Sequence, residues 1–273
     1  MKEYVRLAFQ PPETLKEILI AELFDSGCLG ISEKEDGEME AFFTPGPSTS
    51  GKARAMLHER GLFPELAAVR DRDWLAVWRK NALPVALTKT ITVYPRALPA
   101  RKTKDVKAIV IPPKMSFGTG HHESTRLCAR LIEREAAPGR TLLDVGTGSG
   151  ILAIAAEKSG FASITALDND PVTTENIAEN VRRNRCRRVF PVIGTLESIA
   201  SDKKFDVVCA NIQSSIILAL LPGLLRLAGR SLVFGGILKS ERKTFLGAVA
   251  QSGAALKAEL AENEWMAAVF SKE

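Results

Sequence analysis

Three glycines alternate within residues 146–150, between the apolar stretch 141–145 and the Ala-, Leu- and Ile-rich stretch 151–158. This order predicts a strand, a tight turn and a helix, since glycine turns sharply and no Cβ keeps a ligand away from its backbone. The next apolar stretch ends in Asp168, about 20 residues after the first glycine, where a carboxylate can reach ribose hydroxyls. Ligands of open parallel sheets bind beyond the carboxyl ends of the strands. The two strands therefore predict a nucleoside site.

The spacing of the glycines indicates which nucleoside is bound. A dinucleotide turn usually reads GxGxxG, whereas residues 144–150 read Asp-Val-Gly-Thr-Gly-Ser-Gly. This stretch resembles the first motif of class I S-adenosylmethionine-dependent methyltransferases, and residues 168–170 resemble the second. The resemblance implies that the methionine part of the cofactor lies over the glycine turn and that Asp168 takes the ribose. A nicotinamide-dependent oxidoreductase is the alternative on a similar sheet.

A polar residue also ends a later strand, because the apolar stretch 205–210 leads directly into Asn211. An amide at this edge can accept a hydrogen bond from a target amine and point its lone pair at a methyl carbon. Methyl transfer from a sulfonium is an in-line displacement, so positioning and removal of water can supply most of the rate. We therefore predict Asn211 to be the catalytic residue. A turn or helix-cap role is the structural alternative.

The loop 115–125 precedes the glycine strand by about one helix, predicted over 123–135. It contains two glycines, four hydroxyl side chains and the adjacent His121 and His122. A metal site would need further ligands, and His58 is the only other histidine, so we predict no metal.

The first 70 residues predict a small α+β domain. Strands are expected over 2–9, 28–32, 39–43 and 66–69, with a helix opening at 11–13 and ending at Gly27 and a second helix over 49–60. The order βαββαβ is ferredoxin-like, and such small domains usually serve recognition or assembly.

Residues 71–100 are predicted to be a helical connector, with Asp73, Trp74 and Trp78 on an amphipathic segment. From about residue 101 to 273 apolar strands alternate with helices, which indicates a mostly parallel sheet covered on both faces. The strands of this α/β domain are predicted over 108–111, 141–145, 163–168, 188–193, 205–210 and 231–234.

Composition excludes several classes of protein. Hydrophobic residues make up 45% and charged residues 25% of 273, which is ordinary for a globular chain. No apolar run approaches a membrane span and the N-terminus lacks a secretory signal pattern, so we expect a cytoplasmic protein without membrane contact. The net charge is +5, and its densest basic run is 182–188. That run predicts either a contact with ribosomal RNA or a solvated helix end.

Three features together resemble one family: the loop with Phe117-Gly118-Thr119-Gly120-His121, the glycine turn with Asp168, and Ala210-Asn211-Ile212. They are similar to the bacterial ribosomal protein L-eleven methyltransferases of the PrmA type. The segment Gly236-Ile237-Leu238-Lys239 and the tryptophans of the connector fit the same family.

This resemblance implies a Rossmann-like class I methyltransferase domain with a mostly parallel seven-stranded sheet. The implied reaction transfers methyl groups from S-adenosylmethionine to lysine and N-terminal amines of a ribosomal protein, free or on the ribosome, which the N-terminal domain recognises. The implied cofactor contacts are Phe117, Gly118, Thr119, Thr125, Asp144, Gly146, Gly148, Asp168 and Asn211. Lysines of another protein or a small-molecule amine are alternative acceptors, and a non-catalytic ribosome-binding factor would keep the same fold.

Overall fold

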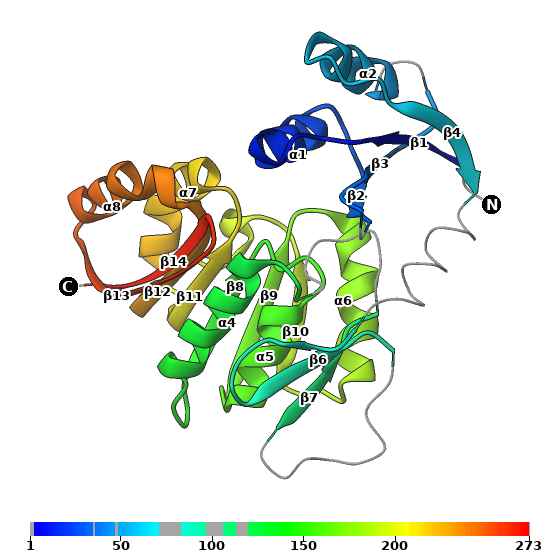
Figure 1. The fold of residues 1–273 in the computed structure, drawn as a ribbon. Coiled ribbons are helices and arrows are strands. Elements are labelled where there is room, and N and C mark those ends of the chain that lie inside the picture. Colours follow the sequence, from blue (N-terminus) through cyan, green and yellow to red (C-terminus); the bar gives the residue numbers. More distant parts are fainter. Residues whose placement is uncertain are drawn as a thin grey trace. The chain divides into compact units, whose positions relative to one another are not determined.

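The fold is described from a computed structural model (Figure 1). The structure describes residues 3–34, 36–46, 49–70, 83–96, 106–112 and 120–272. The chain divides into two compact units, residues 1–82 and 83–273.

The first unit is a four-stranded antiparallel sheet with two helices. Its elements are β1 (Glu3–Phe9), a 3-10 turn (Glu13–Leu15), α1 (Lys16–Asp25), β2 (Gly30–Glu33), β3 (Met39–Phe43), α2 (Thr49–Glu59) and β4 (Glu65–Arg70). The strand order β2-β3-β1-β4 is that of a ferredoxin-like fold, as the sequence predicts. Leu19 and Leu23 of α1 and Leu57 of α2 are fully buried in one core with strand residues such as Leu7 and Phe43. This unit therefore has its own hydrophobic core.

The second unit is built on a seven-stranded sheet. Its elements are α4 (Glu123–Glu135), β8 (Thr141–Val145), α5 (Ile151–Ser159), β9 (Ser163–Asp168), α6 (Pro171–Arg183), β10 (Val189–Ile193), a 3-10 turn (Leu196–Ser198), β11 (Phe205–Asn211), α7 (Ser214–Leu227), β12 (Ala228–Leu238), a 3-10 turn (Lys239–Glu241), α8 (Arg242–Gln251), β13 (Ala254–Glu262) and β14 (Trp265–Lys272). The strand order is β10-β9-β8-β11-β12-β14-β13. The first five strands in this order are parallel. Strand β14 pairs antiparallel with both β12 and β13. The predicted mostly parallel seven-stranded sheet is confirmed.

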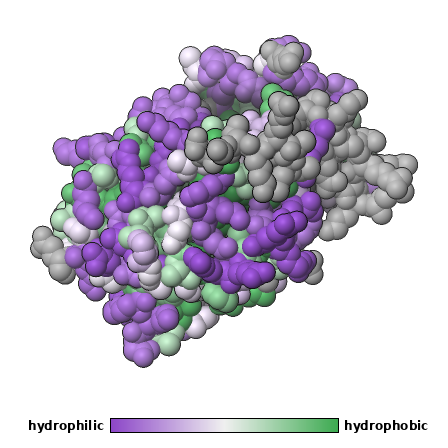
Figure 2. Space-filling model, turned by 90° about the horizontal axis from the view of Figure 1, so that it is seen from below, coloured by the Kyte–Doolittle hydropathy of each residue, from purple (hydrophilic) through white to green (hydrophobic). Residues whose placement is uncertain are grey.

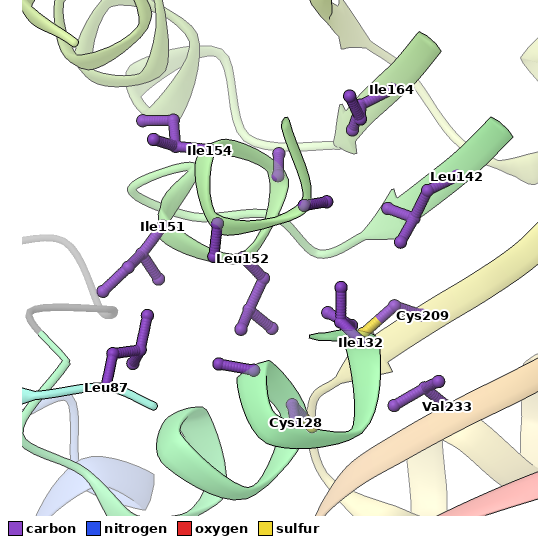
Figure 3. Packing of buried hydrophobic residues seen from close by; sticks show 14 of the residues in the cluster. Leu87, Cys128, Ile132, Leu142, Ile151, Leu152, Ile154, Ile164, Cys209 and Val233 are labelled. Atoms are coloured by element: carbon purple, nitrogen blue, oxygen red, sulfur yellow. The ribbon is translucent and has the colours of Figure 1, made fainter. Parts of the chain in front are cut away.

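Buried side chains alternate between the two faces of this sheet, as the period of two in a strand requires. Leu142 packs with α4, α5 and α6, whereas its neighbour Leu143 packs with α7 and α8. Figure 3 shows the first of these cores, where Cys128 and Ile132 of α4 lie against Cys209 of β11. Because both faces are covered by helices, the free ends of the strands are where a ligand can reach the sheet.

A separate three-stranded sheet was not anticipated. It consists of β5 (Val85–Ala86), β6 (Ile91–Tyr94) and β7 (Lys107–Val110), in the order β5-β6-β7. The prediction that residues 108–111 join the large sheet was wrong, because β7 pairs with β6 instead. The side chain of Asn184 accepts a hydrogen bond from the Val110 amide at 2.7 Å and donates one to its carbonyl at 2.8 Å. A side-chain amide thus occupies the edge of β7 where another strand could pair.

The other strands and helices follow the sequence closely. The structure places α4, β8 and β9 with the predicted bounds, and β12 is longer than the predicted 231–234. Residues 83–96 of the predicted connector carry β5 and β6, whereas Asp73, Trp74 and Trp78 lie outside the described residues. In the part of the chain that the structure describes, no helix is long and apolar enough to span a membrane.

Candidate active site

The glycine turn after β8 exposes bare backbone at the carboxyl edge of the sheet. Gly146, Gly148 and Gly150 have φ angles of +68°, +53° and +79°, which favour glycine. A Cβ on Gly146 would lie 2.6 Å from Cγ2 of Ile212, so this position has no room for a side chain. Gly146 is exposed and Gly148 half-buried, whereas the residues between and after them are buried. The turn can therefore receive a ligand directly on its backbone.

The carboxylate of Asp168 lies beside this turn. It ends β9, the strand next to β8, and its Oδ2 accepts a hydrogen bond from the Gly148 amide at 2.8 Å. Its Oδ1 accepts another from the Asp170 amide at 3.1 Å. The side chain is only partly buried. Each carboxylate oxygen has a second lone pair, so the group can also accept hydrogen bonds from ribose hydroxyls.

Asp144 lies behind the turn rather than on its surface. It is 1% exposed, and its Oδ2 accepts a 2.6 Å hydrogen bond from the Thr147 hydroxyl. Burial raises the pKa of Asp144 to about 7, against the opposing hydrogen bonds from Thr147 and the Ala153 amide. The side chain thus ties the turn to the first turn of α5. Its predicted direct contact with a cofactor remains a prediction, and the geometry favours a positioning role.

Asn211 and Thr125 meet at the end of β11. The Asn211 Nδ2 donates to the Thr125 hydroxyl at 3.4 Å, although 86 residues separate them, and Thr125 is 1% exposed. The Asn211 Oδ1 is buried and has no hydrogen-bond partner among the described residues. A buried acceptor without a partner is costly, and such groups are often reserved for a ligand. In parallel register Ala210 lies opposite Val145, so Asn211 lies beside the glycine turn.

Gly235 allows the contact between Asn211 and Thr125, and this residue was not identified from the sequence. It lies opposite Asn211 on the neighbouring β12. A Cβ there would lie 2.2 Å from Sγ of Cys128 on α4 and 2.9 Å from Oδ1 of Asn211. The absence of a side chain therefore lets α4 approach the sheet closely enough for Thr125 to reach Asn211. The Gly235-Gly236 pair inside an apolar strand was the available signal, since glycine in a strand often marks a close approach.

His121 and His122, which directly precede α4, contact neighbouring parts of the fold. His122 caps the helix, because its Nδ1 accepts a hydrogen bond from the Ser124 amide at 3.2 Å. Its ring lies edge-on against Trp265, with centroids 4.7 Å apart. Burial lowers the pKa of both His121 and His122. Among the described residues, no three His, Cys, Asp or Glu side chains are grouped to hold a metal ion.

The loop before α4 is described only from Gly120 onward, so Phe117, Gly118 and Thr119 lie outside the described residues. Gly120 has a φ of +90°, and a Cβ there would lie 3.1 Å from Cδ1 of Ile151, the first residue of α5. The end of the loop therefore lies against the helix that follows the glycine turn. Of the predicted cofactor contacts that are described, Thr125, Gly146, Gly148, Asp168 and Asn211 gather at the carboxyl ends of β8, β9 and β11.

The sequence of the chain is similar to those of known proteins. Residues 25–273 match the family described as ribosomal protein L11 methyltransferase (PrmA). The chain is 36% identical over 253 residues to the ribosomal protein L11 methyltransferase of Thermus thermophilus, covering 92% of both chains. It is 36% identical over 208 residues to the one of Bacillus cytotoxicus, covering 74% of this chain but only 65% of that relative.

A solved structure agrees with these relatives. The ribosomal protein L11 methylase of Lactobacillus delbrueckii subsp. bulgaricus superimposes with a TM-score of 0.64 at 29% sequence identity. The superposition covers 70% of this chain and 98% of that one. The glycine turn, the acid-ended strand and the family match lead to one conclusion: the chain is an S-adenosylmethionine-dependent methyltransferase and belongs to the ribosomal protein L11 methyltransferase (PrmA) family.

Proposed function

We propose that the protein transfers methyl groups from S-adenosylmethionine to amine nitrogens of ribosomal protein L11, on lysine side chains and the N-terminal α-amino group. The observation that carries this proposal is the buried, unpartnered Oδ1 of Asn211 beside the glycine turn. The relatives named above are L11 methyltransferases, which supports the choice of substrate.

The residues of the site fit the cofactor. Bare backbone at Gly146 and Gly148 can accept its methionine part, and Asp168 can accept hydrogen bonds from its ribose. Thr125 would contribute through its hydrogen bond to Asn211. Phe117, Gly118 and Thr119 are further proposed contacts, on the family resemblance alone. When bound, the cofactor supplies a sulfonium methyl group as the electrophile.

Asn211 would orient the acceptor amine. Its Oδ1 can accept a hydrogen bond from one N–H of the amine and so direct the nitrogen lone pair towards the methyl carbon. The amine must be neutral to attack, and desolvation favours the neutral form of lysine. The buried Thr125 and the helices over both sheet faces would limit the access of water to the acceptor amine from the interior side of the site. Catalysis would then come from positioning and exclusion of water rather than from a covalent intermediate.

The first unit would recognise the substrate. It is a compact unit with a core of its own, and it exposes large apolar side chains: Ile18, Phe24, Phe63 and Leu66. With a ribosomal protein as its substrate, the enzyme would act in the cytoplasm. A contact with ribosomal RNA is also part of the proposal.

The test is mass spectrometry of L11 after incubation with S-adenosylmethionine and the protein. Wild type should add mass in steps of one methyl group at lysines and the N-terminus. Asn211→Ala should lower kcat by about 100-fold, because a lost transition-state hydrogen bond of this kind costs roughly 3 kcal/mol. Gln251→Ala, which removes an exposed amide on α8, is the matched control and should behave as wild type.

Two results would contradict the proposal. If Asn211→Ala methylates as fast as wild type, the amide does not position the acceptor. If L11 stays unmodified while another ribosomal protein in the same extract gains mass, the chain has a different substrate within the same reaction class.

A further inference from the structure

The edge of the large sheet that lies opposite the candidate active site is strongly basic. Five segments lie at the amino ends of the parallel strands, and some of them include the last residues of a helix or the first residues of a strand. In the order of β10, β9, β8, β11 and β12 they are residues 182–188, 158–162, 136–140, 199–204 and 226–230. Because these strands are neighbours in the sheet, the segments lie side by side. We call them together the basic edge.

The basic edge carries eleven Lys or Arg residues and a single acid, Asp202. Five of the basic residues come from 182–188, two each from 199–204 and 226–230, and one from each remaining segment. At the opposite edge, the segments that follow the same strands are 146–150, 169–170, 194–195, 212–213 and 239–241. They contain one basic and two acidic residues. The positive charge is therefore concentrated on one side of the sheet.

Most of these charges are exposed and have no acidic partner. Among the described residues, no carboxylate forms an ion pair with the exposed Arg182, Arg185, Arg187, Lys203, Lys204 or Arg230. Arg183 pairs with Glu179 at 2.6 Å and Arg140 with Glu135 at 3.7 Å. A surface that only needs solubility usually intersperses both signs of charge.

The acids nearest to the basic edge are held by other groups. Glu157 accepts hydrogen bonds from the backbone amides of Arg187 and Arg188, at 3.1 and 2.8 Å. Asp206 accepts bonds from the amide and the hydroxyl of Thr141, at 2.9 and 3.0 Å. These bonds fix the turns that carry the basic side chains. The side chains of Lys158, Arg188, Lys204 and Arg226 donate to backbone carbonyls of the fold. The exposed Arg182, Arg185 and Arg187 are the basic side chains most available to a ligand.

Phe190 adds an aromatic surface to this charge. It is the second residue of β10, two positions after Arg188, and its side chain is 53% exposed. An exposed phenyl ring beside arginines is the combination on which single-stranded nucleic acids bind, with phosphates on the cations and a base stacked on the ring. Figure 2 views the molecule from the side where the basic edge lies in Figure 1, and hydrophilic side chains cover much of that face.

We propose that the basic edge binds single-stranded or looped RNA through its phosphate backbone, with Phe190 stacking on one base. The four spacings between these five strands, at about 4.8 Å each, give a stripe about 19 Å long, enough for several phosphates. The choice of RNA over other polyanions rests on the proposed ribosomal substrate. Because strands of five or more residues separate the two edges, bound RNA leaves the cofactor site open.

Fluorescence anisotropy with a short labelled single-stranded RNA of mixed sequence tests this proposal on the full chain. The variant Arg182→Gln, Arg185→Gln, Arg187→Gln should bind about tenfold or more weakly than wild type. Its plot of log Kd against log salt should be shallower by about 2, since each lost phosphate contact on a single strand removes about 0.7. It spares Arg183 and Arg188, whose side chains bond within the fold.

The matched control, Lys52→Gln, Arg54→Gln, Lys243→Gln, removes the same charge from exposed helical positions elsewhere and should keep wild-type RNA affinity. Equal losses in both variants would mean that net charge alone attracts RNA, and would overturn the proposal. Duplex DNA or polyglutamate binding as tightly as the RNA would also overturn it, and so would competition between RNA and S-adenosylmethionine. Methylation of free L11 by the triple variant should equal wild type. A wild-type protein that leaves L11 unmodified would refute the proposed function without changing the RNA result.

Discussion

At the scale of single residues, the buried Oδ1 of Asn211 has a free-energy cost that contacts within the fold do not offset. An unsatisfied acceptor in the protein interior costs about 1–3 kcal/mol. Its Oδ1 has no partner among the described residues, while Nδ2 is bonded to Thr125. A donor supplied by an acceptor amine would remove this cost only when substrate is bound. In the proposed role of Asn211, the arrangement would therefore favour the complex with substrate over the free enzyme.

Asp144 gives a prediction at the same scale. Burial raises its pKa to about 7 from 3.8, so the folded chain binds its proton more tightly than the unfolded chain does. Its contribution to stability is therefore fully present below about pH 4 and is lost as the pH rises through about 7. That loss is roughly 4 kcal/mol at most, from about three pKa units. In Asp144→Asn this dependence should be absent, so the variant should gain stability relative to wild type as the pH rises.

Urea unfolding followed by circular dichroism, at about pH 4 and about pH 8, measures this difference. Taking the variant minus wild type at each pH cancels the other carboxylates, including Asp206, whose pKa lies below its usual value and whose effect has the opposite sign. A difference that stays constant over this range would show that Asp144 keeps an ordinary pKa.

At the scale of elements, α6 and the residue that follows it bond to two other parts of the second unit through Asn180 and Asn184, which lie one turn apart. Asn180 donates to the Ser149 carbonyl within the glycine turn at 2.8 Å. Asn184 bonds the edge of β7 and also donates to the Asn180 carbonyl at 2.8 Å. Both side chains are buried. The helix that follows Asp168 thus fixes both the turn and the small sheet.

Substitutions at Asn180 and Asn184 should have separate effects, the first on the affinity for the cofactor and the second on the free energy of unfolding. Asn180→Ala releases the turn, so the Kd for S-adenosylmethionine should rise roughly fivefold, which corresponds to about 1 kcal/mol for one hydrogen bond. Asn184→Ala should lower the free energy of unfolding by about 1–3 kcal/mol through unpaired Val110 groups, and leave that Kd unchanged. Calorimetric titration of the cofactor and urea unfolding measure the two effects. Equal Kd changes in both variants would mean that Asn180 acts only through general stability.

At the scale of the whole molecule, local sequence patterns predicted the helices and strands. They did not predict the contacts between residues that are distant in sequence. The bounds of β8 and β9 follow from apolar runs that end at Gly146 and Asp168, and those of α4 follow from the helical spacing of its apolar residues. The separation of β7 from the large sheet did not follow, because it depends on contacts distant in sequence: β7 pairs with β6, and Asn184, 74 residues from Val110, occupies its other edge. The Asn211–Thr125 contact depends on how closely α4 packs on β12, which Gly235 decides. Sequence therefore identified the residues of the proposed site, and packing determines which of them are in contact.

The division into two units leads to the last prediction. One hydrophobic core is formed only by residues of the first unit, and the other two only by residues of the second. All described residues of the proposed cofactor site lie in the second unit. A chain with its own core can fold alone, so a fragment of residues 83–273 should bind S-adenosylmethionine with a Kd within about twofold of the full chain.

The same fragment should methylate L11 with a KM raised by about tenfold or more and a nearly unchanged kcat, because the recognition surface proposed on the first unit is lost. Steady-state kinetics on L11, together with cofactor titration of the fragment, separate the two effects. A fragment that binds cofactor and keeps the KM of the full chain would remove substrate recognition from the first unit. A folded fragment without cofactor affinity would instead show that the first unit contributes to the cofactor site.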